Sequence, residues 1–219
     1  MDVLVEAAVE SLDDALAAVD GGADRLELCA NLAVGGTTPE RELISAVVAS
    51  VNVPVITMIR PRGGSFVYSA RELDRMRRDI EAAIQLGAAG VVLGVLDAEH
   101  CVDVEQTRML AGVAGPEQVS FHRAIDRTPD LLAAADALIS LGIARVLTSG
   151  GAATASEGLV ALDALVSHVG ERLVVVAGGG VRAHTVRGIV EGSGVSEVHA
   201  RCEGSAARIA GIRDVLARM

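Results

Sequence analysis

A histidine and several carboxylates stand where short apolar segments of this chain end, and these residue types can move protons. His122 and Asp126 lie in the segment FHRAID, and Glu27 lies in the segment RLEL. Because histidine titrates near neutral pH, His122 is a candidate for proton transfer, with Glu27 or Asp126 orienting its ring or acting as the base. The alternative is a hydrogen-bonded histidine with a structural role.

Arginines and glycines at similar positions predict a binding site for an anion. Guanidinium groups match the geometry of carboxylate and phosphate, and glycines let backbone N–H groups approach a ligand closely. The residues expected to bind the anion are Arg60, Arg62, Arg123, Ser149, Gly179, Gly180 and Arg201. The alternative is a structural network in which these arginines pair with Glu6, Glu27 and Asp126, since buried arginines are seldom unpaired.

Two kinds of metal site can be drawn from the sequence. Carboxylate and imidazole donors that suit Mn, Zn or Fe(II) are present at Glu6, Glu27, His122 and His199. A Cu(I) site needs soft sulfur ligands, which are present at Cys29, Met58 and Cys202. No local ligand spacing supports either set, and a lone cysteine is more often a small buried hydrophobic residue.

Composition excludes several classes of function. All 19 basic residues are arginine, so chemistry that needs a lysine Schiff base or a P-loop lysine is excluded. The net charge of −10 opposes binding to nucleic acid or to an anionic membrane. Three widely spaced cysteines do not suggest a disulfide framework, and no signal peptide or membrane-length apolar run is present. We therefore expect a cytoplasmic protein.

Short β-branched segments alternate with longer amphipathic segments throughout the chain. The segments expected to form strands are 3–6, 25–28, 55–60, 90–94, 119–122, 145–148, 173–177 and 197–199. The segments expected to form helices are 11–19, 41–50, 71–86, 104–113, 130–141, 156–169, 181–191 and 205–218. Eight such pairs predict an α/β fold, a single (β/α)₈ TIM barrel over residues 1–219. An open doubly wound sheet is the alternative, but the glycines at 178–180 are not a dinucleotide motif.

A barrel would gather the polar residues at one end. Active sites of such barrels lie at the carboxyl ends of the strands. The first strand is expected to end at Glu6, and the helices after the sixth and seventh strands are expected to point their N-termini at a bound anion.

Several long segments resemble the CutC family, which is named for copper homeostasis. They are GGADRLELCANLAVGGTTPE, MIRPRGGSFVYS, FHRAID, VLTSGG and AGGGV, and the resemblance covers residues 5–204. It implies a (β/α)₈ barrel, a cytoplasmic location, homodimers or higher homo-oligomers, and a role in copper handling. Cys29 matches a family cysteine linked to Cu(I), whereas Cys202 falls later than the usual one.

Two functions from different classes follow. The first is copper homeostasis, with Cu(I) bound by Cys29 and by Cys202 or Met58. The second is an enzyme acting on a small phosphorylated or carboxylated metabolite, in which the arginines hold the anion and His122 moves protons with Glu27 or Asp126. A scaffold or oligomeric partner protein is a third alternative, since fold alone does not fix function.

Overall fold

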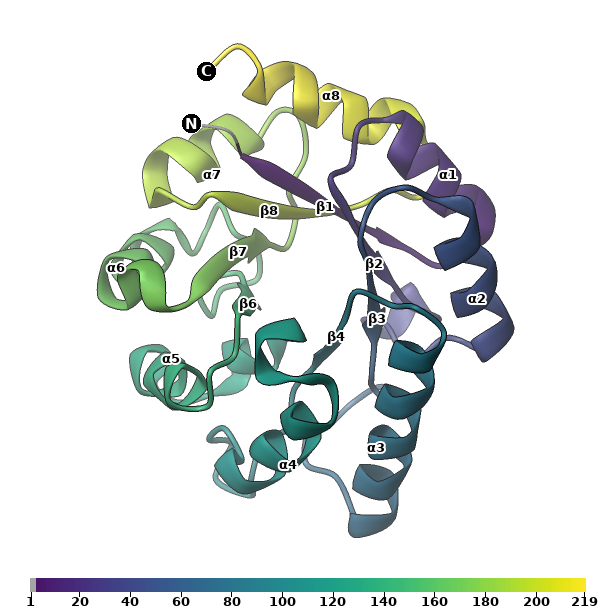
Figure 1. The fold of residues 1–219 in the computed structure, drawn as a ribbon. Helices are drawn as coiled ribbons and strands as arrows, with labels where there is room; N and C mark the ends of the chain where they lie inside the picture. Colours follow the sequence, from purple (N-terminus) through teal and green to yellow (C-terminus); the bar gives the residue numbers. More distant parts are fainter. Residues whose placement is uncertain (1–2) are drawn as a thin grey trace.

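The computed structural model describes residues 3–219, which form a closed barrel of eight parallel strands ringed by helices (Figure 1). Each strand pairs with the next in chain order, and β8 closes the ring on β1. The strands are β1 (Leu4–Val9), β2 (Arg25–Leu28), β3 (Val55–Met58), β4 (Gly90–Leu93), β5 (Val119–Phe121), β6 (Arg145–Thr148), β7 (Val174–Gly178) and β8 (Glu197–Arg201). The predicted (β/α)₈ barrel is confirmed, and the open sheet is wrong.

One α-helix follows each strand and covers the outside of the barrel. The helices are α1 (Leu12–Asp20), α2 (Arg41–Ser50), α3 (Ala70–Gln85), α4 (Val104–Ala114), α5 (Leu131–Ser140), α6 (Leu159–Val169), α7 (Val186–Ser193) and α8 (Ala206–Leu216). Local sequence explains their starts. Before α3, the Ser69 hydroxyl accepts a bond from the Glu72 N–H, and the Glu72 carboxylate accepts one from the Ser69 N–H.

The first strand is longer than predicted. β1 continues to Val9 because Ala7 and Ala8 are also buried and apolar, so the prediction that it ends at Glu6 is wrong. Glu6 instead lies in the middle of the strand, in register with Arg25 of β2 and His199 of β8. Its carboxylate therefore lies inside the barrel, below the mouth.

Other boundaries change the loops around the mouth. β3 ends at Met58, so Arg60 lies in the loop that follows the strand. α6 and α7 begin at Leu159 and Val186, later than the predicted residues 156 and 181. Loops therefore connect β6 to α6 and β7 to α7, and the expectation that these helix N-termini point at a bound anion stays a prediction.

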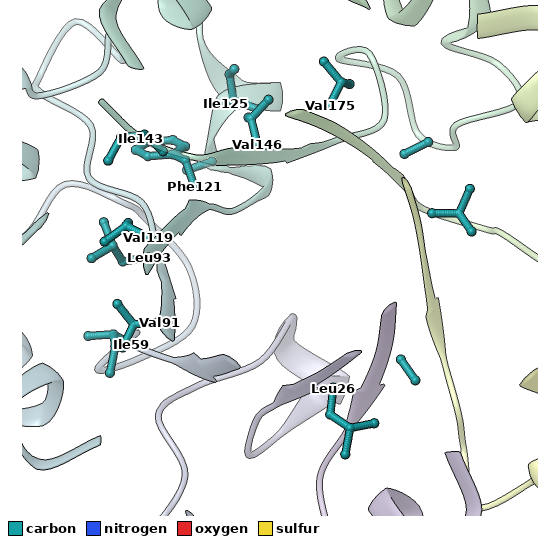
Figure 2. Packing of buried hydrophobic residues seen from close by; sticks show 14 of the residues in the cluster. Leu26, Ile59, Val91, Leu93, Val119, Phe121, Ile125, Ile143, Val146 and Val175 are labelled. Carbon is teal, nitrogen blue, oxygen red and sulfur yellow. The ribbon is translucent and has the colours of Figure 1, made fainter. Parts of the chain in front are cut away.

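Alternation along the strands separates two layers of side chains. Successive residues of a strand point to opposite faces of the sheet. Leu26 and Leu28 of β2 pack in the main apolar cluster with residues of the helices and of other strands, such as Val91 and Phe121. Figure 2 shows labelled members of this cluster arranged around the ring of strands. Valine, leucine, isoleucine and alanine thus make the layer between strands and helices.

Alternate positions of three neighbouring strands place charged residues together in the interior. The Arg25 guanidinium lies between the Glu6 and Glu197 carboxylates, with N–O distances of 2.5 Å to each. All three side chains are buried. Burial of charge is costly, and here pairing offsets that cost and ties β1, β2 and β8 to one another.

We predict that Arg25→Met lowers the free energy of unfolding by about 3–5 kcal/mol, because the buried carboxylates of Glu6 and Glu197 both lose the guanidinium that is their nearest cation. Arg187→Met on α7 is the matched control. Within residues 3–219 it pairs with the exposed Glu191, so we expect a change of about 0.5 kcal/mol or less. Urea unfolding measures both values, and equal effects of the two variants would contradict the structural role of Arg25.

Candidate functional site

A cavity of about 1260 Å³ opens at the carboxyl ends of the strands. The predicted residues that line it are Glu27, Met58, Arg60, His122, Arg123, Asp126, Gly179, Gly180, His199 and Arg201. Arg62, Ser149, Cys29 and Cys202 do not belong to its lining. The barrel therefore brings most of the predicted residues to one mouth, but their contacts give them different structural and chemical roles.

One wall of the cavity carries an imidazole between two carboxylates. His199 Nδ1 lies 2.8 Å from Glu6 Oε1, and His199 Nε2 lies 3.8 Å from Glu27 Oε2. Within residues 3–219, these three side chains form the group of histidine, cysteine and acidic residues whose ligand atoms are close enough for one metal ion. Three of the four residues proposed for an O/N-ligand metal site are thus together, and His122 is not part of the group.

Burial and charge act in opposite directions on these groups. Burial alone would raise the pKa of Glu6, but the His199 hydrogen bond and the Arg25 charge lower it to about 2. Burial raises the pKa of Glu27, which has no arginine hydrogen-bonded to it. Burial would lower the pKa of His199, but the charges of Glu27 and Glu6 raise it. Glu6 is therefore ionised and held in place by its partners. At Glu27 the neighbouring charges offset less of the cost of burying the carboxylate.

Cys29 adjoins this group. Its Sγ lies 3.4 Å from Glu27 Oε2, and burial together with the Glu27 charge raises the pKa of the thiol well above its usual range. A Cβ atom at position 36 would lie 3.1 Å from Cys29 Sγ and 3.3 Å from Met58 Cε, so the Met58 side chain is a close neighbour. Cys29 thus offers sulfur beside Glu27, and the Met58 side chain lies near Cys29.

Cys202 lies apart from that sulfur pair. Its Sγ contacts the Ser205 carbonyl oxygen at 3.8 Å, and its side chain packs in the main apolar cluster rather than in the small one that holds Cys29. Burial raises the pKa of the Cys202 thiol. The structure therefore does not bring the two candidate copper cysteines into one group.

His122 lines the cavity as an uncharged ring. Its Nδ1 accepts a hydrogen bond from the Ala124 N–H at 3.2 Å. Burial and the charge of Arg60 lower the pKa of His122 to about 3. The hydrogen bonds of residues 3–219 include none from His122 to Glu27 or Asp126, so the structure does not connect the three residues predicted to transfer protons.

Asp126 organises the loop after β6. Its carboxylate accepts bonds from the Thr148 hydroxyl at 2.5 Å, the Gly151 N–H at 3.1 Å, and both the N–H and hydroxyl of Ser149. It also pairs with Arg123 Nε at 2.7 Å. A carboxylate with so many donors positions the loop and has little capacity left to act as a base.

The guanidinium groups of Arg60 and Arg62 are engaged by groups of the protein itself. Backbone carbonyl oxygens bind Arg60, and the side chains of Glu72 and Tyr68 contact Arg62. Arg60 donates to the carbonyl oxygens of Val34 and Gly36 at 3.0 Å each, and to that of Gly64 at 3.1 Å. Arg62 pairs with Glu72 and packs over the Tyr68 ring, with 5.1 Å between its guanidinium carbon and the ring centroid. Both arginines are thus bound by protein groups, but their partners are not the carboxylates of Glu6, Glu27 and Asp126 that the structural alternative named.

Arg123 and Arg201 are the predicted anion-binding arginines that keep part of their guanidinium at the cavity. Arg201 donates to the Leu32 carbonyl oxygen at 2.7 Å. Arg123 donates to Ser149 Oγ at 2.6 Å, so Ser149 fixes the arginine and does not itself line the cavity.

Residues missed by the sequence reasoning lie below the mouth. Arg25 and Glu197 carry the interior ion pairs, and Arg145 Nε lies 3.5 Å from Glu197. Their signal was present in the sequence, because charged residues alternate with apolar ones in RLEL and EVHAR. Period-two alternation in a barrel strand places one set in the interior and the other against the helices.

We predict that His122 makes stability depend on pH. The unfolded state takes up a proton near the ordinary pKa of 6.5, whereas the folded state does so only near 3. The contribution of neutral His122 is therefore present above pH 6.5 and is lost as the pH falls toward 3. Between pH 6.5 and 4.5, wild type should lose about 2 kcal/mol more unfolding free energy than His122→Gln, as measured by urea unfolding. If the unfolding free energies of wild type and His122→Gln changed equally with pH, the result would contradict a buried, neutral His122 ring.

Comparisons with known proteins match nearly the whole chain. Residues 3–204 match the family described as the CutC family. The copper homeostasis protein cutC homolog of Homo sapiens is 43% identical over 96% of this chain and 76% of its own length. A CutC family protein of Chromobacterium violaceum is 44% identical over 94% of this chain and 84% of its own length.

Solved structures agree with this result. The CutC structure from Streptococcus agalactiae superposes with a TM-score of 0.85 at 35% identity, over 90% of this chain and 97% of that one. A phosphoribosylanthranilate isomerase of Thermotoga maritima shares only 14% identity with a TM-score of 0.63, and shows the barrel fold alone. With the family match over residues 3–204, these findings show that the chain is a member of the CutC family.

Proposed function

We propose that this chain takes part in copper homeostasis, as the names of its relatives state for those proteins, and that it binds a copper ion at the barrel mouth. The observation that supports the proposal is the buried group of Glu6, Glu27 and His199, with Cys29 at its edge. Glu27 and His199 Nε2 are the donors at the cavity, and both residues line it.

The donor set fits a copper ion. Carboxylate and imidazole suit divalent first-row ions, and affinity among these rises toward Cu(II). Cu(I) prefers sulfur, which Cys29 supplies next to Glu27 and Met58 supplies near Cys29. Because the Cys29 thiol is protonated and buried, coordination by its sulfur would release a proton.

In this proposal Glu6 positions the imidazole ring of His199. It bonds His199 Nδ1 and is itself held by Arg25. A carboxylate on the far nitrogen of a ligating histidine fixes the ring and leaves the other nitrogen free for the metal. Cys202 is not part of the proposed site, since its sulfur contacts the Ser205 backbone instead.

Two sequence-based expectations accompany the proposal. Of the helices within residues 3–219, none is long and apolar enough to cross a membrane. The cytoplasmic location stays a prediction, as does the homodimer or higher homo-oligomer, which light scattering on the purified protein would measure.

The proton-transfer enzyme is not proposed, because no hydrogen bond links His122 to Glu27 or Asp126 within the described residues.

Competitive titration of the purified protein with Cu(II), and anaerobically with Cu(I), tests the proposal. We predict that Glu27→Gln and His199→Asn weaken Cu(II) binding by about 100-fold or more, because each removes a donor. Glu6→Gln should weaken it by about 10–100-fold, because the imidazole loses its orientation. Cys29→Ser should weaken Cu(I) binding and leave Cu(II) binding nearly unchanged.

Cysteines outside the group provide matched controls. Cys101 is exposed and Cys202 lies in the apolar cluster, so Cys101→Ser and Cys202→Ser should leave both affinities unchanged. Circular dichroism of each variant separates lost binding from lost folding. Copper affinity that is indifferent to Glu27, His199 and Cys29 but depends on Cys202 would overturn the proposal.

A further inference from the structure

The cavity wall formed by the segments after β5, β6 and β7 has no part in the copper proposal. The residues of the copper proposal come from β1, β2, the residue after β2, the end of β3, and the strand β8 that closes the ring. The cavity of about 1260 Å³ is far larger than an ion requires and has room for a small organic molecule. The wall formed by the segments after β5, β6 and β7 is therefore free to contact such a molecule.

His122 presents a buried N–H group to that ligand. Since its Nδ1 accepts from the Ala124 N–H, the neutral ring carries its proton on Nε2. This Nε2 atom is buried and has no hydrogen-bond partner within residues 3–219. A buried donor without an acceptor is unfavourable by about 1–3 kcal/mol, and a ligand oxygen at the cavity would satisfy it.

Arg123, the next residue along the chain, is held in place by the protein. Its Nε donates to Asp126 at 2.7 Å, and its Nη2 donates to Ser149 Oγ at 2.6 Å and to the Ala152 carbonyl oxygen at 3.3 Å. Nη1 takes no part in these bonds. A guanidinium fixed in this way loses little conformational freedom when its remaining donors bind an anion.

Glycine keeps space beside the free edge of Arg123. A Cβ atom at position 179 would lie 3.1 Å from Arg123 Nη1, and the Gly179 backbone has φ +96°, which other residues rarely adopt. The adjoining residues Gly180 and Gly151 also have positive φ and line the cavity. The segments after β6 and β7 thus place backbone, without side chains, close to the arginine.

The charge of this wall is positive although the whole chain is acidic. Arg123, Arg127 and Arg182 from these segments line the cavity, and Asp126 is the acidic residue among them, paired with Arg123 at 2.7 Å. Glu203, from the segment after β8, pairs with Arg182 at 3.3 Å. In a chain of net charge −10, this local excess of guanidinium favours an anion at this wall over the rest of the surface.

We propose that this wall binds the oxyanion group of a small carboxylated or phosphorylated molecule, with His122 Nε2–H and Arg123 Nη1 as its donors. The two anion types share oxygen acceptors and negative charge, which is what these donors recognise. None of the proposed copper donors belongs to this site, so it stands independently of the copper proposal.

Nuclear magnetic resonance of the metal-free protein with ¹⁵N-labelled histidine tests the site directly. The His122 Nε2–H resonance is assigned by its absence in His122→Gln. Titration with inorganic phosphate and, separately, with oxalate should shift this resonance saturably, and the tighter ligand identifies the anion type. Because no metal is present, failure of copper binding and failure of anion binding give different results.

Calorimetry with the tighter anion gives the second readout. Arg123→Gln should weaken binding at least about tenfold, because a charged donor becomes neutral. Arg187→Gln on α7 removes an arginine that pairs with exposed Glu191 outside the cavity lining, and it should not change affinity. Equal affinity in wild type and Arg123→Gln would overturn the proposal. A His122 resonance that stays fixed at saturating phosphate and oxalate would overturn it as well.

Discussion

The paired charges of Arg25 inside the barrel are the interaction on which the mouth depends. The interior of a (β/α)₈ barrel is usually filled by branched apolar side chains. Here Arg25 neutralises Glu6 and Glu197, which come from the strands at the two ends of the chain. Glu6 in turn bonds His199, and His199 faces Glu27. One continuous set of contacts therefore runs from the barrel interior to Glu27 and His199 at the cavity.

The two walls of the mouth have opposite chemical character. β1, β2 and β8 contribute carboxylates and an imidazole, whereas the segments after β5, β6 and β7 contribute guanidinium groups, glycines and a neutral histidine. His122 and His199 differ for the same reason. Burial lowers the pKa of His122, which has the positive Arg60 near it, whereas two carboxylates raise the pKa of His199. Two histidines of one cavity are thus suited to different partners.

Sequence patterns predicted the fold and the general position of the site well. Alternating segments gave eight strands in the right order, and polar residues at strand ends such as Glu27 and His122 line one mouth. The role of each residue could not be predicted, because that role depends on contacts between segments that are distant in sequence. Asp126 looked like a base, yet its donors come from Thr148, Ser149 and Gly151.

The error at Glu6 has a specific physical origin. Taking Glu6 as the end of the first strand overlooked that a charged residue can lie mid-strand when neighbouring strands supply its partners. Arg25 and His199 are those partners, and they lie 19 and 193 residues away in sequence. The alternation of charged and apolar residues in the second and eighth strands carries this information, but only once the ring is known to be closed.

X-ray diffraction at the copper absorption edge, from crystals grown with copper, tests the central claim most directly. The account predicts an anomalous peak within bonding distance of both the Glu27 carboxylate and His199 Nε2, with Glu6 still bonded to His199 Nδ1. A peak at Cys202, or one confined to surface residues with this group unchanged from the metal-free crystal, would contradict it.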